Sequence, residues 1–291
     1  MAREFKGLTL TGWLLRGLRR AGLYLCLALI GLTMILPLVW MVSTSLKQER
    51  AVFSLIPQWI PNPIVWSNYL KIWTLPSIPY AIFFLNSVFI AVCVTIGHVF
   101  ASACGAYAFA RLQFPGRDRL FFAYIATMMI PGSVTIIPVF ILMKLFGWID
   151  TYRALIVPGM FTAFGTFLLR QFFLTISQDV IDAAKIDGAS TFRIFWRIVL
   201  PMSKPALAAL TIATFMGNWQ SFMWPLLVVD SVEKKTLPVG LAYFQEQYQF
   251  ANPNWPLLMA ASLVAMLPIV LLFVFNQRYF IRGIRLTGVQ R

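Results

Sequence analysis

Acidic residues are scarce in this sequence. Its 291 residues include 10 Asp and Glu against 24 Lys and Arg, and 12% of the residues are charged, about half the share found in soluble domains. The charges are also unevenly placed, because long segments contain none. These uncharged segments are residues 21–46, 72–110, 120–143, 154–169, 205–229 and 247–277. So little charge, distributed in this way, excludes a soluble enzyme and a disordered chain.

Cysteine and histidine are rarer still. Cys26, Cys93 and Cys104 all fall in uncharged segments, and their spacing fits neither a metal site nor a disulfide framework, so we expect them to pack as small hydrophobic side chains. His98 is the only histidine, and no Asp or Glu lies in the uncharged segments. A proton relay would need such partners. We therefore expect His98 to be packed and hydrogen-bonded without a direct role, and we expect no proton- or voltage-driven transport.

A phosphate-binding P-loop is absent as well. None of the 17 glycines is followed by lysine, whereas that loop needs Gly-Lys-Ser or Gly-Lys-Thr to hold the phosphates. The chain is therefore not expected to bind ATP through this motif.

Apolar residues, in contrast, are abundant. Hydrophobic residues make up 59% of the chain, and the mean hydropathy is +0.77. A helix of about 20 apolar residues crosses a bilayer, because the bilayer leaves no water to satisfy backbone groups. The sequence thus predicts an all-α polytopic membrane protein with about six transmembrane helices in a single domain, residues 21–281. The predicted spans lie near residues 21–46, 82–110, 119–144, 154–176, 205–229 and 256–279.

The basic residues indicate how the spans are oriented. Six spans place both termini on one side of the membrane, so that residues 1–20, 111–119, 170–204 and 278–291 share that side, and these segments hold 17 of the 24 Lys and Arg. Cytoplasmic loops collect such residues, so the N-terminal segment 1–20 and the tail 282–291 are both predicted to be cytoplasmic. The net charge of +14 then follows from orientation in a lipid bilayer, and no nucleic-acid partner is expected.

Prolines predict breaks in several spans. Pro131 and Gly132 are adjacent in the third span. Because proline removes a backbone donor and glycine adds freedom, that helix is expected to bend or break there. Pro158, Pro225 and Pro268 mark the fourth, fifth and sixth spans in the same way. Whether such a break is a fixed kink or a moving hinge is left open.

The most charged stretch, residues 178–201, lies between the fourth and fifth spans. It is cytoplasmic by the predicted topology, and its pattern predicts two short helices. In the first, residues 178–187, Ala183 and Ala184 form a thin face that can pack closely. Gly188 suits the position after a helix where the backbone turns left-handed.

The second helix has an N-cap signal at Ser190, and Pro201 is expected to end it. Its apolar side chains recur at helical spacing and predict one apolar face, with Arg193 and Arg197 beside it. The face consists of Phe192, Phe195, Trp196 and Val199. A small knob with a polar rim is typical of a docking element. The alternative is an amphipathic helix on the membrane surface, which leaves the Ala-Ala and Asp-Gly-Ala run unexplained.

This segment resembles a known motif. The run Asp182-Ala183-Ala184-x-x-Asp187-Gly188-Ala189, followed after eight residues by Ile198-x-Leu200-Pro201, is similar to the E-A-A-x-x-D-G-A-x8-I-x-L-P loop of permease subunits in binding-protein-dependent ABC importers. Asp182 stands where that family usually has Glu, and its shorter side chain has less reach. The similarity extends over most of the chain, and the further similar segments favour the maltose-type, carbohydrate-uptake branch of the family. It includes residues 106–111, 114–117, 128–131, 167–173, 218–219, 224–226 and 236–241.

The resemblance implies a coupling mechanism in the bacterial cytoplasmic (inner) membrane. The knob would sit in a cleft of a separate ATPase subunit, and dimerisation of two ATPase subunits would rock a pair of permeases between inward- and outward-facing states. It also implies a second permease, commonly a related but different chain, and an extracytoplasmic solute-binding protein. ATP and Mg would be held by the ATPase, and this chain would hold no cofactor or metal. The implied ATPase-coupling residues are Asp182, Ala183, Ala184, Asp187, Gly188, Ala189, Arg193, Arg197, Leu200 and Pro201.

Two further groups are candidate contacts with the solute or its carrier. Asn218, Trp219 and Gln220 in the fifth span are candidates for the substrate pathway, with hydrogen bonding between helices as the alternative. Residues 242–255 correspond, by the resemblance, to an outer loop that reaches toward the binding protein. The candidates there are Gln245, Gln247, Tyr248 and Asn252, with ordinary loop polarity as the alternative.

The predicted function is that of a permease subunit of an ATP-driven importer for a sugar or oligosaccharide, and not that of an enzyme. A polyol or a glycerol phosphate ester is the alternative solute. A membrane-embedded transferase is disfavoured, because it would need acidic residues or histidine clustered at a membrane edge. A self-contained channel or secondary carrier leaves the segment from Asp182 to Pro201 unexplained.

Overall fold

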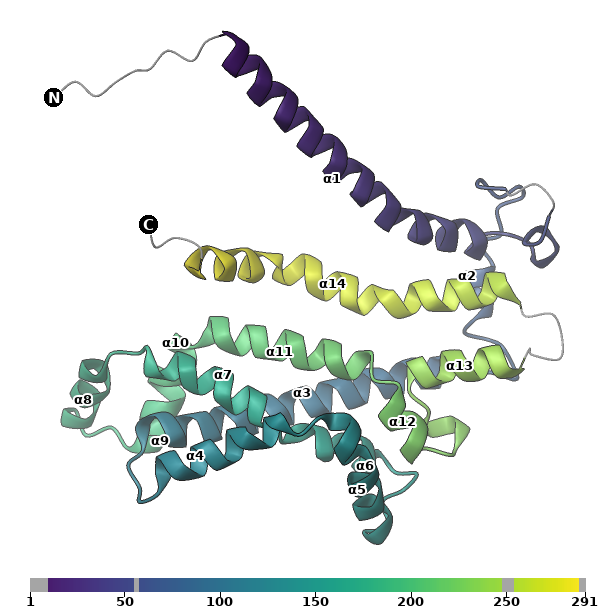
Figure 1. Cartoon of the computed structure of the whole chain (residues 1–291). Helices are drawn as coiled ribbons and strands as arrows, with labels where there is room; N and C mark the ends of the chain where they lie inside the picture. The colour runs from purple at the N-terminus through teal and green to yellow at the C-terminus, as the bar shows by residue number, and fades with distance from the viewer. Residues whose placement is uncertain (1–9, 55–57, 248–253, 288–291) are drawn as a thin grey trace. The chain divides into compact units, whose positions relative to one another are not determined.

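The fold is helical throughout the described part of the chain. The computed structural model describes residues 10–54, 58–247 and 254–287 (Figure 1), and every element in these ranges is a helix. Four runs are long and apolar enough to cross a membrane, and the number rises to six if each of two bent helix pairs counts as one span. The four are Gly17–Ser45, Tyr80–Arg111, Tyr152–Leu174 and Trp255–Phe275. The predicted all-α polytopic fold is confirmed.

The chain divides into two compact units. Unit 1 comprises residues 1–72 and 253–263, and unit 2 comprises residues 73–252 and 264–291. The last helix, α14 (Trp255–Thr287), contributes to both.

In unit 1 a loop folds back on the end of a long apolar helix. The elements before α14 are α1 (Leu10–Ser45), η1 (Glu49–Ala51) and α2 (Asn68–Lys71). The Asn68 amide donates to the backbone carbonyls of Ser45 at 2.8 Å and Lys47 at 3.1 Å, which lie where a helix end leaves carbonyls without partners. The rings of Trp40 on α1 and Trp59 in the loop meet edge-on at 5.2 Å. The loop that follows α1 is therefore tied to α1 inside unit 1.

Unit 2 is built around α3, which packs along α7 and α11 (Figure 1). Its elements are α3 (Tyr80–Arg111), α4 (Arg117–Ala126), η2 (Thr127–Met129), α5 (Gly132–Leu145), α6 (Tyr152–Ile156), η3 (Pro158–Met160), α7 (Ala163–Leu174), α8 (Gln178–Ile186), α9 (Thr191–Ile194), η4 (Phe195–Val199), α10 (Leu200–Met202), α11 (Lys204–Trp219), α12 (Met223–Val228), η5 (Val232–Lys234) and α13 (Leu237–Gln247), besides the later part of α14.

His98 joins the three central helices. Its Nε2 lies 2.7 Å from Thr162 Oγ1 at the start of α7, and its Nδ1 lies 3.0 Å from Thr214 Oγ1 on α11. The ring is 5% exposed. The packed, hydrogen-bonded position predicted for this histidine is confirmed.

Glycines allow α3 and α7 to approach closely. A Cβ added at Gly165 on α7 would lie 2.5 Å from His98 Nε2 and 3.0 Å from Ser102 Cβ, and one added at Gly105 on α3 would lie 3.3 Å from Thr166 Cγ2. Small residues at such crossings bring helix backbones together, which is how helices associate in lipid.

The prolines break some helices and not others. The run formed by α4 and η2 (Arg117–Met129) meets α5 at a bend of 101° beside Pro131, as predicted. The predicted fifth span, 205–229, is not one continuous helix, because α11 ends at Trp219 and α12 begins at Met223. Pro225 lies in the first turn of α12, where its missing N–H costs no hydrogen bond. Pro268, in contrast, lies inside the unbroken α14.

The three cysteines are free thiols, but their packing differs from the prediction. Cys93 is partly buried, whereas Cys26 and Cys104 are exposed. Cys104 lines a pocket together with Tyr107, Thr191 and Phe192, so sequence hydrophobicity alone did not reveal its surroundings.

Candidate functional site

The stretch between α7 and α11 forms two short helices, as predicted. The first, α8, is followed by Gly188 with a φ of 75°, a left-handed conformation that a Cβ would strain. The N–H groups of Gly188 and Ala189 bond to the carbonyls of Lys185 and Ala184, both at 2.9 Å. The predicted helix stop at Gly188 is confirmed.

The second helix begins as predicted but does not end at Pro201. Ser190 Oγ accepts a hydrogen bond from the Arg193 N–H at 3.3 Å. After α9 the helix widens into the π-helical turn η4, in which the Leu200 N–H bonds to the Phe195 carbonyl, and it passes through Pro201 as α10. The wider turn shifts the carbonyls with which the proline ring would otherwise clash. The chain bends only after α10, at 78° to α11.

The apolar side chains of the second helix divide between two faces. Phe195 is 4% exposed and Val199 is 0% exposed, and both join Ile194 in the core of unit 2, whereas Phe192 is 71% exposed and Trp196 is 45% exposed. The predicted single face is therefore wrong. The helix packs on the bundle through positions 194, 195 and 199, which leaves 192 and 196 at the surface.

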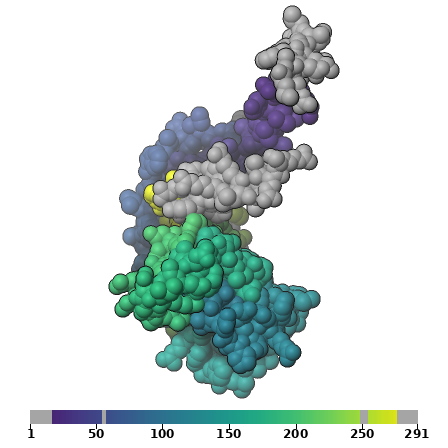
Figure 2. All heavy atoms as spheres, turned by 90° about the vertical axis from the view of Figure 1, so that its left-hand side faces the viewer, coloured from purple at the N-terminus to yellow at the C-terminus, as the bar shows by residue number. Residues whose placement is uncertain are grey.

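The first helix divides in a similar way. Ile181 and Ala184 are buried in the same core, while Ala183 and Ile186 are exposed, the latter at 87%. Figure 2 faces the end of unit 2 at which α8 and α9 lie, and the green atoms of this stretch form the surface there. We call residues 178–202 the coupling segment. Its inner side is fixed to the bundle, and its outer side combines the Asp-Gly-Ala turn with large apolar side chains.

The charged groups of the coupling segment differ in their surroundings. Asp182 Oδ1 accepts hydrogen bonds from Lys185 Nζ at 3.1 Å and from Gln178 Nε2 at 3.0 Å. The hydrogen bond from Lys185 makes the largest contribution to holding the pKa of Asp182 below its usual range, and the bond from Gln178 makes the next largest. The side chain of Asp182 is nevertheless 52% exposed. The other charged candidates are exposed as well; they are Asp187, Arg193 and Arg197.

A pocket of about 300 Å³ lies in unit 2 where several helix breaks meet. Residues of α3, α5, η3 and the α11–α12 break line it, and none of them is charged. The side chains there that can form hydrogen bonds are Ser87, Thr135, Asn218, Ser221, Trp224 and Thr236. Thr236 is 5% exposed, and its Oγ1 has no hydrogen-bond partner within the described structure. The pocket therefore offers hydroxyl and amide groups and an indole ring, without a charge.

The three pathway candidates of the fifth span separate in the structure. Asn218 lines the pocket, and its Nδ2 donates to the Thr214 carbonyl at 2.8 Å. Trp219 is 3% exposed and donates from Nε1 to the Ala265 carbonyl at 3.0 Å. Gln220 is exposed, and neither it nor Trp219 lines the pocket.

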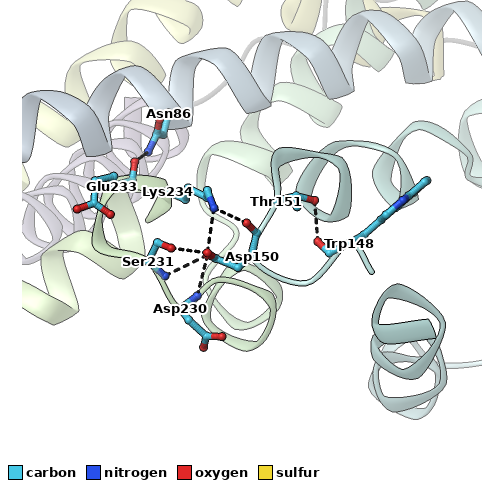
Figure 3. A network of polar contacts seen from close by, with 8 residues as sticks. All are labelled: Asn86, Trp148, Asp150, Thr151, Asp230, Ser231, Glu233 and Lys234. Atoms are coloured by element: carbon cyan, nitrogen blue, oxygen red, sulfur yellow. Dashed lines mark hydrogen bonds and ion pairs between the residues drawn. The ribbon is translucent and has the colours of Figure 1, made fainter. Parts of the chain in front are cut away.

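A polar network ties two loops together near the N-terminal half of α3 (Figure 3). Asp150, between α5 and α6, accepts from the backbone N–H groups of Asp230 at 3.1 Å and Ser231 at 3.0 Å, from the Ser231 hydroxyl, and from Lys234 Nζ at 2.9 Å. The Asn86 amide of α3 donates to the backbone on the far side of the same loop (Figure 3). The network thus fixes the chain that leads into the pocket residue Thr236.

The carboxylate of Asp150 is stabilised in its charged form. Burial alone would raise its pKa, but the hydrogen bonds from Ser231 and Lys234, and from the backbone of Ser231 and Asp230, hold the pKa well below its usual range. A depressed pKa stabilises the fold above the pKa of the unfolded chain, about 3.9, and this contribution is lost as the pH falls through the folded-state pKa.

Asp150→Asn is expected to lower the stability of the purified chain by about 1–2 kcal/mol at pH 7. Asparagine tolerates the positive φ of 57° at this position, so backbone strain would not cause the loss of stability. The loss would arise because the new amide nitrogen would face Lys234. Thermal unfolding in detergent measures the loss. The difference from the native chain should shrink at pH values below about 4, and Asp230→Asn, at the exposed neighbour, should have little effect. Equal melting temperatures at pH 7 would contradict this role.

Comparison with known proteins identifies the family. The family described as binding-protein-dependent transport system inner membrane component matches residues 97–286. The chain belongs to this family. It is therefore a multi-pass protein of the inner membrane.

Relatives of this inner membrane component share about a third of its sequence. The sn-glycerol-3-phosphate transport system permease protein UgpE of Yersinia pestis bv. Antiqua (strain Antiqua) is 36% identical over 262 residues, which cover 88% of this chain and 92% of the relative. The arabinooligosaccharides transport system permease protein AraQ of Halalkalibacterium halodurans is 36% identical over 230 residues, covering 79% of this chain and 81% of the relative.

Solved structures share the fold of this inner membrane component. A chain in the crystal structure of a bacterial ABC transporter involved in the import of the acidic polysaccharide alginate matches with a TM-score of 0.82 at 24% identity, over 91% of this chain and 96% of that one. A chain from the alginate transporter in complex with a pentasaccharide-bound periplasmic protein matches with a TM-score of 0.61 at 12% identity, over 90% and 96%.

The candidates for contact with a binding protein are only partly described. Gln245 and Gln247 are exposed at the C-terminal end of α13 in this inner membrane component. Tyr248 and Asn252 lie outside the described residues.

Two residues near the coupling segment were not predicted from the sequence. Tyr107 and Arg111 lie in the last turns of α3 and reach the coupling segment through hydrogen bonds. A signal for both was present, because they fall in the run 106–111 that shares the family resemblance, and Arg111 ends an uncharged segment.

Proposed function

We propose that this inner membrane component is a permease subunit of an ATP-driven importer whose ATP and Mg are held by separate ATPase subunits. The coupling segment carries the proposal. Its inner side is buried, while Ile186 and Phe192, at 87% and 71% exposed, stand on either side of the Asp-Gly-Ala turn. Large apolar side chains beside a tight turn suit the cleft of a protein partner.

The partners proposed are a second permease, two ATPase subunits and an extracytoplasmic solute-binding protein. The description of the family names the binding protein, and the absence of a Gly-Lys pair in the sequence favours an ATPase on another chain. Under this proposal the ATPase contacts the exposed residues at the Asp-Gly-Ala turn of the coupling segment, from Ile186 to Phe192. Gln245 and Gln247 remain proposed contacts for the binding protein, and both are exposed.

The proposed solute is a neutral sugar, oligosaccharide or polyol. A phosphate ester carries charge that a pocket must balance with cationic side chains, since an unpaired buried charge is costly. No charged residue lines the pocket around Asn218, while hydroxyls and the Trp224 ring suit a sugar. A glycerol phosphate ester is the second candidate, favoured by the relative named for that solute.

A transport role is favoured over a membrane-embedded transferase, because the relatives are named as permease proteins of transport systems.

Uptake by the complete complex in proteoliposomes tests the proposal. With ATP inside, we expect uptake of a radiolabelled arabinooligosaccharide to exceed that of sn-glycerol 3-phosphate. Asn218→Ala should lower uptake about tenfold, as loss of one or two hydrogen bonds would, whereas Gln171→Ala, at an exposed amide of α7 outside the pocket, should not. Uptake that needs no ATPase subunit would refute the transport proposal, and preferred uptake of the phosphate ester would refute the neutral solute.

A further inference from the structure

The last turns of α3 reach both halves of the coupling segment. Arg111 donates from Nη1 to Gln178 Oε1 at 2.7 Å, at the first residue of α8. One turn earlier, the Tyr107 hydroxyl donates to the Thr191 carbonyl at 3.2 Å, at the first residue of α9. The Tyr107 ring also packs on Phe195 at 5.1 Å. A single transmembrane helix therefore contacts both helices of the coupling segment.

Arg111 also ties α3 to the end of α7. Its Nη2 donates to the carbonyls of Phe173 and Ile176, which lie at a helix end where carbonyls lack partners within the helix. In the opposite direction, Arg170 of α7 donates from Nε to the Phe109 carbonyl of α3 at 3.2 Å. The planar guanidinium of Arg111 thus serves three acceptors at once, a geometry that a lysine ammonium cannot reproduce.

The hydrogen bonds continue from Arg111 to Asp182. Gln178 accepts from Arg111 and donates from Nε2 to Asp182 Oδ1 at 3.0 Å, and Lys185 donates to the same oxygen at 3.1 Å. Asp182 occupies the position at which the family resemblance leads one to expect a glutamate. With one methylene fewer, its carboxylate reaches less far, and although the side chain is 52% exposed, the two donors hold Oδ1 close to its own helix.

We propose that Arg111 is a positioning residue that holds the coupling segment to α3 through Gln178 and Asp182, and that Asp182 serves this internal link and is not an ATPase contact. The inference rests on the proposed coupling function of the segment. Movement of the segment is passed to α3 at this link, so a looser link lets ATP hydrolysis run without moving the bundle. The energy-coupling step is then sensitive to Arg111 even though its guanidinium lies on the inner side of the segment.

The test uses the complete complex in proteoliposomes and measures two quantities, the solute taken up per ATP hydrolysed and the affinity for the ATPase subunit. Arg111→Lys is expected to lower uptake per ATP about tenfold, as loss of a charged, multidentate hydrogen bond would, with the affinity for the ATPase unchanged. Arg119→Lys, at an exposed arginine of α4, is the matched control and should keep the native ratio.

Asp182→Ala distinguishes between two roles for Asp182, the internal link and an ATPase contact. We expect this variant to lower uptake per ATP while keeping the native affinity for the ATPase, and Asp187→Lys on the exposed turn to weaken that affinity. Hydrogen exchange of the purified chain adds a measurement that needs no transport: residues 178–191 should exchange faster in Arg111→Lys, and α13 should not change.

The outcomes distinguish the two proposals. A native complex that captures no ATPase refutes the proposed function itself. A native complex that transports, with Arg111→Lys showing the same uptake per ATP and the same exchange, overturns the inference alone. A loss of ATPase affinity in Asp182→Ala equal to that in Asp187→Lys places Asp182 at the ATPase contact and also overturns it.

Discussion

Gly188→Pro is expected to abolish ATP-dependent uptake while leaving membrane insertion intact. Gly188 has a φ of 75°, whereas the proline ring fixes φ near −65°. Proline would also remove the N–H that bonds to the Lys185 carbonyl at 2.9 Å. A Cβ at this position would meet nothing within 4 Å, so the effect comes from the backbone and not from crowding. The turn must then rebuild, at a local cost of about 3 kcal/mol, and the exposed side of the coupling segment loses its shape.

Two other substitutions at Gly188 are expected to have smaller effects. Asparagine adopts the left-handed conformation readily, so Gly188→Asn should keep most of the uptake. Gly188→Ala should lose an intermediate share of the uptake, because alanine in this conformation is strained by about 1–2 kcal/mol. Uptake in proteoliposomes and co-purification of the ATPase subunit measure the series. Native uptake by Gly188→Pro would show that the turn has no part in coupling.

Features that depend on a few neighbouring residues were predictable from the sequence. The stop at Gly188, the cap at Ser190 and the break beside Pro131 all follow from local backbone sterics or one side-chain hydrogen bond, and the structure has all three. The polytopic helical fold followed from uncharged length, because the bilayer imposes the same requirement on every helix; the structure has four such runs, or six if each of the two bent pairs counts as one span. Such features need no knowledge of what the segment packs against.

Features that depend on packing between distant segments were not predictable. The π turn before Pro201 forms where the second helix of the coupling segment meets the bundle, and that contact buries Phe195 while leaving Phe192 exposed. The pocket combines Ser87 with Asn218 and Thr236 from distant parts of the chain. Helical spacing places residues on a face, but it does not indicate which neighbour covers that face.

Gly165→Ala is expected to destabilise the α3–α7 pair by about 3 kcal/mol, at the upper end of the cost of overpacking. The new methyl group would lie 2.5 Å from His98 Nε2 and 3.0 Å from Ser102 Cβ. The His98 ring cannot simply turn away, because hydrogen bonds hold it to Thr162 at 2.7 Å and to Thr214 at 3.0 Å. Relief of the clash therefore requires the helices to separate or both hydrogen bonds to break, and thermal unfolding in detergent measures the loss.

The matched control is Gly217→Ala on α11, where an added Cβ meets nothing within 4 Å. Alanine favours a helix over glycine by about 1 kcal/mol, so this variant should be as stable as the native chain or more so. Ser102→Ala should restore part of the stability lost in Gly165→Ala, because it removes an Oγ that crowds the added Cβ. This Oγ has no hydrogen-bond partner in the described structure. The rescue should be only partial, because the clash with His98 remains. Equal melting temperatures for Gly165→Ala and Gly217→Ala would mean that the α3–α7 crossing is looser than its glycines indicate, and that the central bundle can repack around an extra methyl group.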